Sequence, residues 1–221
     1  MAGESVIAIV ATLVTGGAGL TGIIGLVKWL LERRDKLKKE EWAARQAMMA
    51  ERIPQMFNAF ARLYDALRPP IETYGAVRVA LLKASDSGSI PRIGVPLFVT
   101  SVAEVHASHM TPMRHHWLNR PVDDVYIQFL IELLAKQSVE FSTDSLPDES
   151  VLKDALRFGL VGATDARAIC HSNKEMYYLT VHFTEDVPDD PAYRETVSLI
   201  VREIKAILME EIAAAGEQNG K

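Results

Sequence analysis

The stretch FNAFARLYDALRPPIETYGAVRVALLKA, residues 57–84, joins a helix to a strand and decides the fold. Apolar residues recur at helical spacing as far as Leu67, which is typical of a helix with one buried face. Pro69 and Pro70 end that helix, because proline donates no backbone N–H group. The next residues, AVRVALLKA at 76–84, are aliphatic and β-branched, which favours a strand. We therefore expect a helix that leads directly into the first strand of a sheet.

The helical apolar pattern extends upstream of this stretch. Its stripe repeats at the spacing of one face of an amphipathic helix. The members of the stripe are Met49, Ile53, Phe57, Phe60, Tyr64 and Leu67. Pro54 lies inside the stripe, and we expect a kink or a fresh start of the helix there, because the proline ring excludes one helical hydrogen bond.

Downstream of residue 76, the spacing of apolar residues is in some segments typical of strands and in others typical of helices. Strands are predicted over residues 76–84, 96–106, 139–143, 166–172 and 176–184, with a tight turn over residues 172–175. Helices are predicted over residues 122–136, from a cap at residues 148–150 to about residue 160, and from residues 188–191 onward. The apolar face of the last helix consists of Tyr193, Val197, Ile200, Val201, Ile204 and Leu208. We expect an α+β domain with a central antiparallel sheet, flanked by N- and C-terminal helices that pack together on one face.

Composition limits the class of protein. The chain has 221 residues, a formal net charge of −5 and a single cysteine, Cys170. The acidic balance gives no overall basic field for nucleic acid, and one cysteine cannot form an intramolecular disulfide. We expect a transmembrane helix over residues 1–31, a charged juxtamembrane helix over 32–50, the α+β domain over 51–213 and a flexible tail over 214–221.

The N-terminal segment SVIAIVATLVTGGAGLTGIIGLV, residues 5–27, carries no charged side chain. A helix of this length can cross a bilayer core of ~30 Å. A cleaved signal peptide would carry its basic residues before the apolar run, whereas here they follow it. A re-entrant hairpin and a buried core helix are the alternatives to a span. Lys and Arg residues near a span stay on its cytoplasmic side. We therefore expect a single-pass protein of a bacterial or host inner membrane, with the N-terminus outside and the C-terminal domain in the cytoplasm. A location in a virion is the alternative.

The N-terminal run also contains small residues at four-residue spacing, which lets membrane helices approach closely and associate. The predicted packing residues are Ala11, Thr15, Gly16, Gly19, Gly22 and Gly25. The predicted interfacial anchor consists of Lys28, Trp29, Arg33 and Arg34. These residues predict a membrane-attached homo-oligomer.

The order of elements resembles that of GAF domains, the sensor fold related to PAS domains. The entry segment at residues 57–84 and the closing strand YYLTVHFT at 177–184, with its following helix, carry the resemblance. It covers about Ile53 to Glu210 and implies a module that binds a small ligand or a protein. A span followed by a short GAF-like domain is also similar to small membrane-anchored proteins of tailed phages and prophages.

Two features of the GAF family have no counterpart here. The Asn-Lys…Phe…Asp-Glu signature of members that bind cyclic nucleotides has no match in the sequence. Bilin-binding members attach the chromophore through a loop cysteine, whereas Cys170 lies in a predicted strand and is expected to be a core or surface residue. We therefore expect no cofactor.

Four of the histidines, His106, His109, His115 and His116, lie close together in sequence. Their spacing matches none of the compact metal motifs, so surface or pH-responsive contacts are favoured over a metal site. No nucleophile, base and orienting group can be placed together. The sequence therefore favours a non-enzymatic binding, sensing or protein-interaction module on a membrane. The alternatives are a phage or prophage structural, lysis or membrane-acting protein, and an enzyme.

Overall fold

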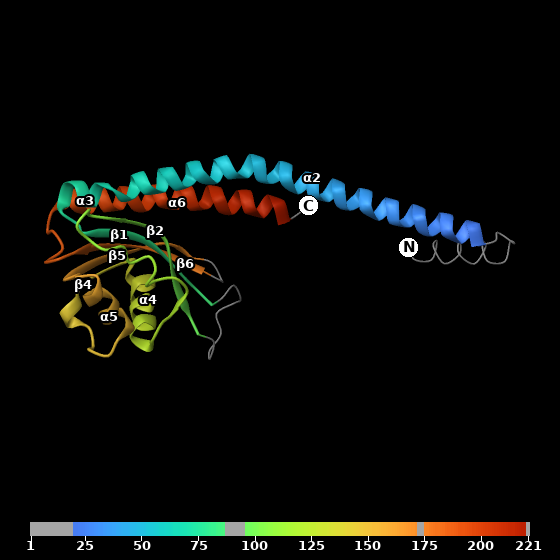
Figure 1. The fold of residues 1–221 in the computed structure, drawn as a ribbon. Coiled ribbons are helices and arrows are strands. Elements are labelled where there is room, and N and C mark those ends of the chain that lie inside the picture. The colour runs from blue at the N-terminus through green and yellow to red at the C-terminus, as the bar shows by residue number, and fades with distance from the viewer. Residues whose placement is uncertain (1–19, 87–95, 172–174, 220–221) are drawn as a thin grey trace. The chain divides into compact units, whose positions relative to one another are not determined.

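The structure is a computed structural model that describes residues 20–86, 96–171 and 175–219 (Figure 1). Contacts within the chain divide it into two units, Met1–Phe57 and Asn58–Lys221. The helix α2 (Leu20–Leu67) begins in the first unit and ends in the second. The other helices are α3 (Pro69–Tyr74), α4 (Asp124–Lys136), the 3-10 turn η1 (Thr143–Ser145), α5 (Val151–Phe158) and α6 (Pro191–Asn219). The strands are β1 (Arg78–Ser85), β2 (Phe98–His106), β3 (Arg120–Pro121), β4 (Ser138–Ser142), β5 (Ala163–His171) and β6 (Glu175–Phe183).

The strands of the second unit form one six-stranded antiparallel sheet in the order β3-β2-β1-β6-β5-β4. The first and last long strands, β1 and β6, are therefore neighbours at its centre, with Arg78 opposite His182 and Ser85 opposite Glu175. The pairing of β1 with β2 shifts by one residue between Leu81 and Leu82, which is a β-bulge.

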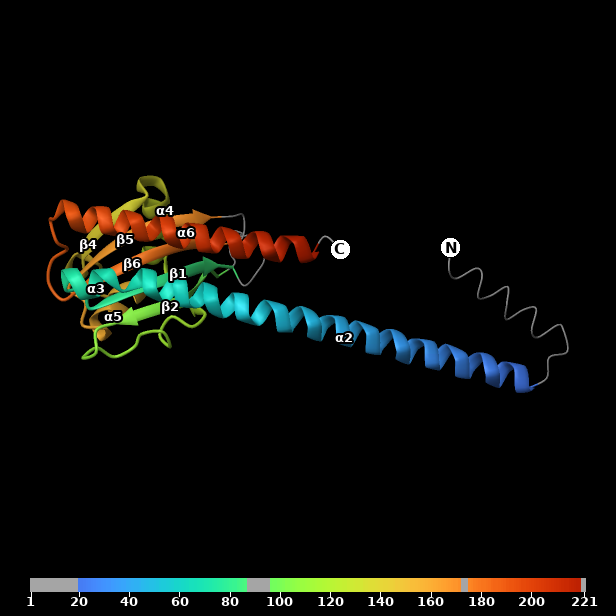
Figure 2. The same ribbon diagram turned by 90° about the horizontal axis from the view of Figure 1, so that it is seen from above.

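Each face of the sheet has its own apolar layer. The helices α4 and α5 cover one face, and α3, α6 and the last turns of α2 cover the other (Figure 2). Side chains alternate between faces along a strand, so Val79 and Leu81 of β1 pack toward α6 while Ala80 and Leu82 pack toward α4 and α5. The predicted α+β architecture, a sheet with the entry and closing helices on one face, is confirmed.

Local sequence explains where the helices begin and end. Asp123 caps α4 by accepting from the backbone N–H of Tyr126 at 2.9 Å, and its other oxygen accepts from Val151 N at 2.6 Å. Ser150 caps α5 by accepting from Lys153 N at 3.2 Å. Gly75 ends α3 with φ of 73°, a left-handed conformation that glycine adopts without strain.

Two local features differ from the sequence-based expectations. A kink or a fresh start of the helix was predicted at Pro54, and the fresh start does not occur: α2 runs through Pro54 as one helix, because strong helix formers on both sides outweigh a proline cost of about 3 kcal/mol. The short strand β3, which pairs with Phe98 and Val99 of β2, lies between residues 106 and 122, where no strand or helix was predicted. Two residues are too short to show a pattern. The tight turn predicted over residues 172–175 falls largely outside the described residues.

Candidate functional site

A row of polar side chains crosses the sheet on the face that α4 and α5 cover. Arg78 on β1 is paired with His106 on β2 and with His182 on β6, and His182 is paired with Thr164 on β5. Directly paired residues in a sheet point to the same face. Ala80, two residues after Arg78 on the same strand, packs in the apolar cluster of α4 and α5. The row therefore lies on that side of the sheet.

The strongest interaction of this row is a buried ion pair between Arg78 and Glu104. Arg78 Nε donates to Glu104 Oε1 at 3.1 Å, and the two side chains are only 1% and 3% exposed. Burial lowers the pKa of Arg78, and the Glu104 carboxylate opposes that shift. An arginine keeps its charge under these conditions, so the pair brings two opposite charges into the interior.

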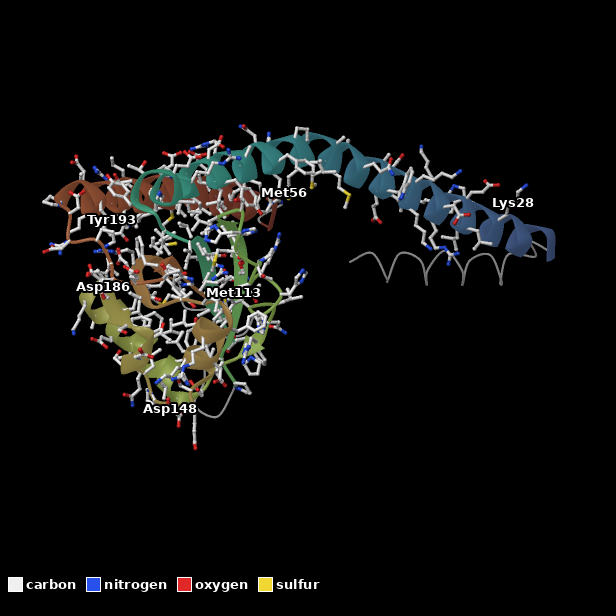
Figure 3. The ribbon with its side chains drawn as sticks, turned by 60° about the vertical axis from the view of Figure 1, so that its left-hand side comes forward. Lys28, Met56, Met113, Asp148, Asp186 and Tyr193 are labelled. Atoms are coloured by element: carbon white, nitrogen blue, oxygen red, sulfur yellow. The ribbon has the colours of Figure 1, made fainter. Side chains whose placement is uncertain are left out.

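This ion pair also holds the segment between β2 and β3 against the sheet. Arg78 Nη2 donates to the carbonyl oxygen of Thr111 at 2.8 Å, and the backbone N–H of Met113 donates to Glu104 Oε1 at 2.8 Å. Gly159, just after α5, approaches the same point, where an added Cβ would lie 2.8 Å from Arg78 Nη1. Figure 3 shows Met113 on the side of the sheet opposite Tyr193 of α6.

Several polar atoms of this region are buried without a hydrogen-bond partner among the described residues. They are Arg78 Nη1, Glu104 Oε2, His182 Nδ1 and Thr164 Oγ1. Buried polar groups in folded proteins are usually satisfied by protein, water or ligand. Burial lowers the pKa of His182 to about 3, and the positive charge of Arg78 adds to the shift. His182 is therefore neutral at ordinary pH and can act as both donor and acceptor.

Aromatic side chains lie farther along the same face of the sheet, with Tyr178 four residues before His182 on β6. The hydroxyl groups of Tyr126 and Tyr178 lie 2.6 Å apart, and both residues are buried. Trp117 and Phe129 meet the Tyr126 ring edge-to-face at 5.6 Å between centroids. Burial is the first cause of the raised pKa of Tyr178, so its hydroxyl stays protonated. This aromatic cluster forms the apolar wall of the layer.

The four clustered histidines are not brought together into a metal site. His106 is part of the polar row and its Nδ1 lies 3.0 Å from the carbonyl oxygen of Ala107. His116 packs against Phe158 at 4.1 Å between ring centroids, while His109 and His115 are exposed. Within the described ranges, no group of three or more His, Cys, Asp or Glu residues is arranged to hold a metal ion.

Cys170 lies on β5 and packs, half-buried, into the apolar layer beneath α6. Burial raises the pKa of its thiol. The thiol is thus on the face opposite the polar row and is a weak nucleophile. This agrees with the expectation of a core or surface residue.

The predicted membrane residues lie in or next to the N-terminal part that the structure does not describe. Ala11, Thr15, Gly16 and Gly19 fall outside the described residues, and Gly22 and Gly25 belong to the first turns of α2. The predicted anchor residues Lys28, Trp29, Arg33 and Arg34 are exposed on α2, with the Arg33 guanidinium 5.1 Å from the Trp29 ring centroid. Among the described residues, no helix combines the length and apolarity needed to span a bilayer.

Sequence reasoning missed the polar row. Its one available signal was a charged or titratable residue inside an apolar strand, as with Arg78 in AVRVALLKA and His182 in YYLTVHFT. Such residues are rarely buried without a partner, so each one points to a contact that the linear sequence does not name.

No protein-family profile and no curated protein matches the chain. Solved structures of GAF domains do match its fold. A phycocyanobilin-bound GAF domain from a cyanobacterial phytochrome superposes with a TM-score of 0.50 at 16% identity, over 73% of this chain and 90% of that domain. The photoproduct state of GAF3 of Slr1393 from Synechocystis sp. PCC6803 superposes with a TM-score of 0.53 at 12% identity, over 72% of this chain and 99% of that domain. The chain therefore has a GAF-like fold.

The residues present do not fit a covalently bound bilin. The only cysteine, Cys170, lies beneath α6 and not on the face with α4 and α5. On that second face, Tyr126 and Tyr178 occupy the layer and bond to each other. A thiol on one side of a sheet cannot form a bond to a group held on the other side.

Proposed function

We propose that the protein is a non-catalytic sensing module that binds a small polar ligand beside the polar row of the sheet. The observation that carries this proposal is the set of unpartnered buried atoms on Arg78, Glu104, Thr164 and His182. Leaving a buried polar atom unsatisfied costs roughly 1–3 kcal/mol. A ligand that completes these hydrogen bonds would recover that free energy, which makes the row a favourable place to bind.

The chemistry of the unpartnered atoms limits the ligand. Arg78 Nη1 can only donate and an ionised Glu104 Oε2 can only accept, so the ligand needs both an acceptor and a donor. Neighbouring strands are about 4.8 Å apart, so the row from Thr164 to Arg78 spans roughly 10 Å. The adjoining wall contains Trp117 and Tyr126. A nucleoside or an aromatic amino acid has a suitable size, a planar ring and both kinds of polar group.

The test is a thermal-shift screen of the full chain against nucleosides, nucleotides and amino acids. A ligand that binds only the folded state raises Tm with its concentration. Thr164→Val is the informative variant, because the Thr164 hydroxyl has no hydrogen-bond partner among the described residues and valine keeps the shape of the side chain. Ser198→Ala, on the exposed side of α6, is the control. The proposal predicts a smaller ligand-induced shift in Tm for Thr164→Val alone, and it is wrong if no compound raises Tm.

We also propose that residues 5–27 attach this module to a membrane. The support is the absence of charged side chains in the run together with the basic and aromatic residues that follow it, Lys28, Trp29 and Arg33. A charge in the middle of a span is costly. Leu13→Arg should therefore shift the full chain from the alkali-resistant membrane fraction to the soluble fraction, whereas Leu13→Phe should not. Equal distributions of the two variants would contradict attachment by this run.

A further inference from the structure

A strict heptad repeat runs along the second half of α2. Its positions alternate at spacings of four and three residues, the a and d pattern of helices that pack along a shared seam. The members are Trp42, Gln46, Met49, Ile53, Met56, Phe60, Leu63 and Leu67. All of them except Gln46 are apolar, and none is charged.

The last members of this repeat form an interface within the second unit. Leu63 and Leu67 are buried in the apolar layer that includes Tyr193, Val197 and Ile200 of α6. The end of α2 is held beside α6 by Arg62, whose guanidinium contacts Glu203 at 3.0 Å and Glu210 at 2.7 Å. Two heptad positions, Leu63 and Leu67, are therefore used for helix–helix packing, whereas Phe60 remains 37% exposed.

The upstream members of the same repeat have no such cover. Met49 is 56% exposed and Ile53 is 46% exposed, although both have the same heptad roles as the buried residues. Trp42 and Met56 are exposed as well, and Figure 3 shows the Met56 side chain on α2. We name Trp42, Gln46, Met49, Ile53 and Met56 the α2 heptad surface.

Residues beside this surface widen it without adding charge. The e positions of the repeat are Ala43, Ala50 and Phe57, and Phe57 is exposed. A stripe that includes a, d and e positions is typical of helices packed in a bundle. Because no a, d or e position from Trp42 to Phe57 is charged, two copies of this stripe can meet without like-charge repulsion.

We propose that the α2 heptad surface binds the same surface of a second copy of this chain, with the two α2 helices parallel. In a parallel pair of helices, each a or d residue packs against the same residue of the second copy, so apolar residues face apolar residues. Gln46 then faces Gln46, and a side-chain amide can both donate to and accept from its own copy. An antiparallel pair would place Gln46 against apolar positions, where its amide would lose these partners. A single polar a position is a known means of fixing register and partner number.

This pairing is independent of the ligand proposed above and uses other residues. Its test places one cysteine at a d position of the full chain in detergent, in a Cys170→Ser background. Met56→Cys should form an intermolecular disulfide under mild oxidation, because parallel d positions bring Cβ atoms close to disulfide distance. Asn58→Cys, at the f position on the outer side of the helix, is the matched control and should form at least tenfold less disulfide-linked dimer. Equal crosslinking at the two positions, or none at Met56→Cys, would overturn the parallel pairing.

Light scattering of the full chain separates this surface from the glycine-rich N-terminal run. Ile53→Lys puts a charge at an a position and should reduce the dimer mass to that of a monomer, whereas Gln55→Lys, at a c position, should leave it unchanged. A dimer that survives Ile53→Lys but is lost with Gly19→Leu and Gly22→Leu together would overturn the proposal and assign association to the N-terminal run. A monomeric unmodified chain at micromolar concentration would overturn it as well.

Discussion

The hydroxyl groups of Tyr126 on α4 and Tyr178 on β6 lie 2.6 Å apart in a fully buried layer, so one hydroxyl donates a hydrogen bond to the other. The two residues are separated by 52 positions in the sequence. Their contact links the helix that covers the sheet to the strand at its centre. It also makes each hydroxyl dependent on the other for its hydrogen bond.

Removing one of these hydroxyls leaves the other buried without that partner. We expect Tyr126→Phe or Tyr178→Phe to lower the free energy of unfolding by about 1–3 kcal/mol. The double variant should cost less than the sum of the two, because both polar groups are then gone. Urea unfolding of the four proteins in this cycle measures the coupling. Tyr74→Phe, whose hydroxyl lies 3.1 Å from Thr196 Oγ1 in a half-buried setting, is the control. Additive losses would contradict a direct bond.

Arg78→Met should destabilise the protein far more than the matched change Lys83→Met. Both residues lie on β1 and each pairs with one glutamate, but Lys83 and Glu175 are about one-third exposed. Loss of Arg78 strands the buried charge of Glu104, which costs about 3–5 kcal/mol. Loss of a partly exposed pair costs about 1 kcal/mol or less. Thermal unfolding measures the difference, and similar losses in the two variants would mean that the Arg78–Glu104 pair is hydrated.

The buried His182 predicts a loss of stability on acidification. Its pKa in the folded protein is about 3, against 6.5 for an unperturbed histidine. Between these two pH values, His182 binds a proton in the unfolded chain but not in the folded one. The free energy of unfolding therefore falls as the pH drops from 6.5 to about 3. Urea midpoints across this range measure the slope.

Substitution of His182 isolates its share of that slope. His182→Gln should flatten the pH dependence of the urea midpoint, because the amide does not titrate. His171→Gln, at an exposed position on β5, should leave the slope unchanged. An unaltered slope in His182→Gln would show that other groups cause the acid sensitivity.

Gly159 should not tolerate a methyl group. An added Cβ would overlap Met113 Sδ and come within 2.8 Å of Arg78 Nη1. We expect Gly159→Ala to lower the free energy of unfolding by about 1–3 kcal/mol through overpacking. Met113→Ala makes room, so the double variant should be more stable than the sum of the single changes predicts. Met110→Ala, in the same segment, is the control and should give an additive result.

The sequence was sufficient to predict most of the elements, because their apolar periods are strong. Tyr193, Val197 and Ile200 marked the inner face of α6, and all three are buried. The two-residue strand β3 was missed because its pairing with β2 is a tertiary contact. At Pro54 the fresh start, one of the two predicted outcomes, does not occur, because flanking helix formers outweigh one unfavourable position.

The candidate site was not predictable in the same way. Arg78 and Glu104 are 26 positions apart, and their ion pair exists only because β1 and β2 are adjacent. The exposed part of the apolar stripe on α2 was also hidden, since a periodic pattern does not tell which of its members find a partner. Met49 and Leu67 have the same character in the sequence but differ in exposure, 56% against 0%.

The adjacency of β1 and β6 at the centre of the sheet has a consequence for synthesis of the protein. Ala80 on β1 accepts a hydrogen bond from Thr180, 100 residues later in the chain. The ribosome must therefore release almost the whole second unit before β1 gains its second neighbour. Until then β1 and β2 form a hairpin with one open edge and an uncovered apolar face, so folding should be slow. The nascent chain in this interval is the form most exposed to aggregation and most in need of a chaperone.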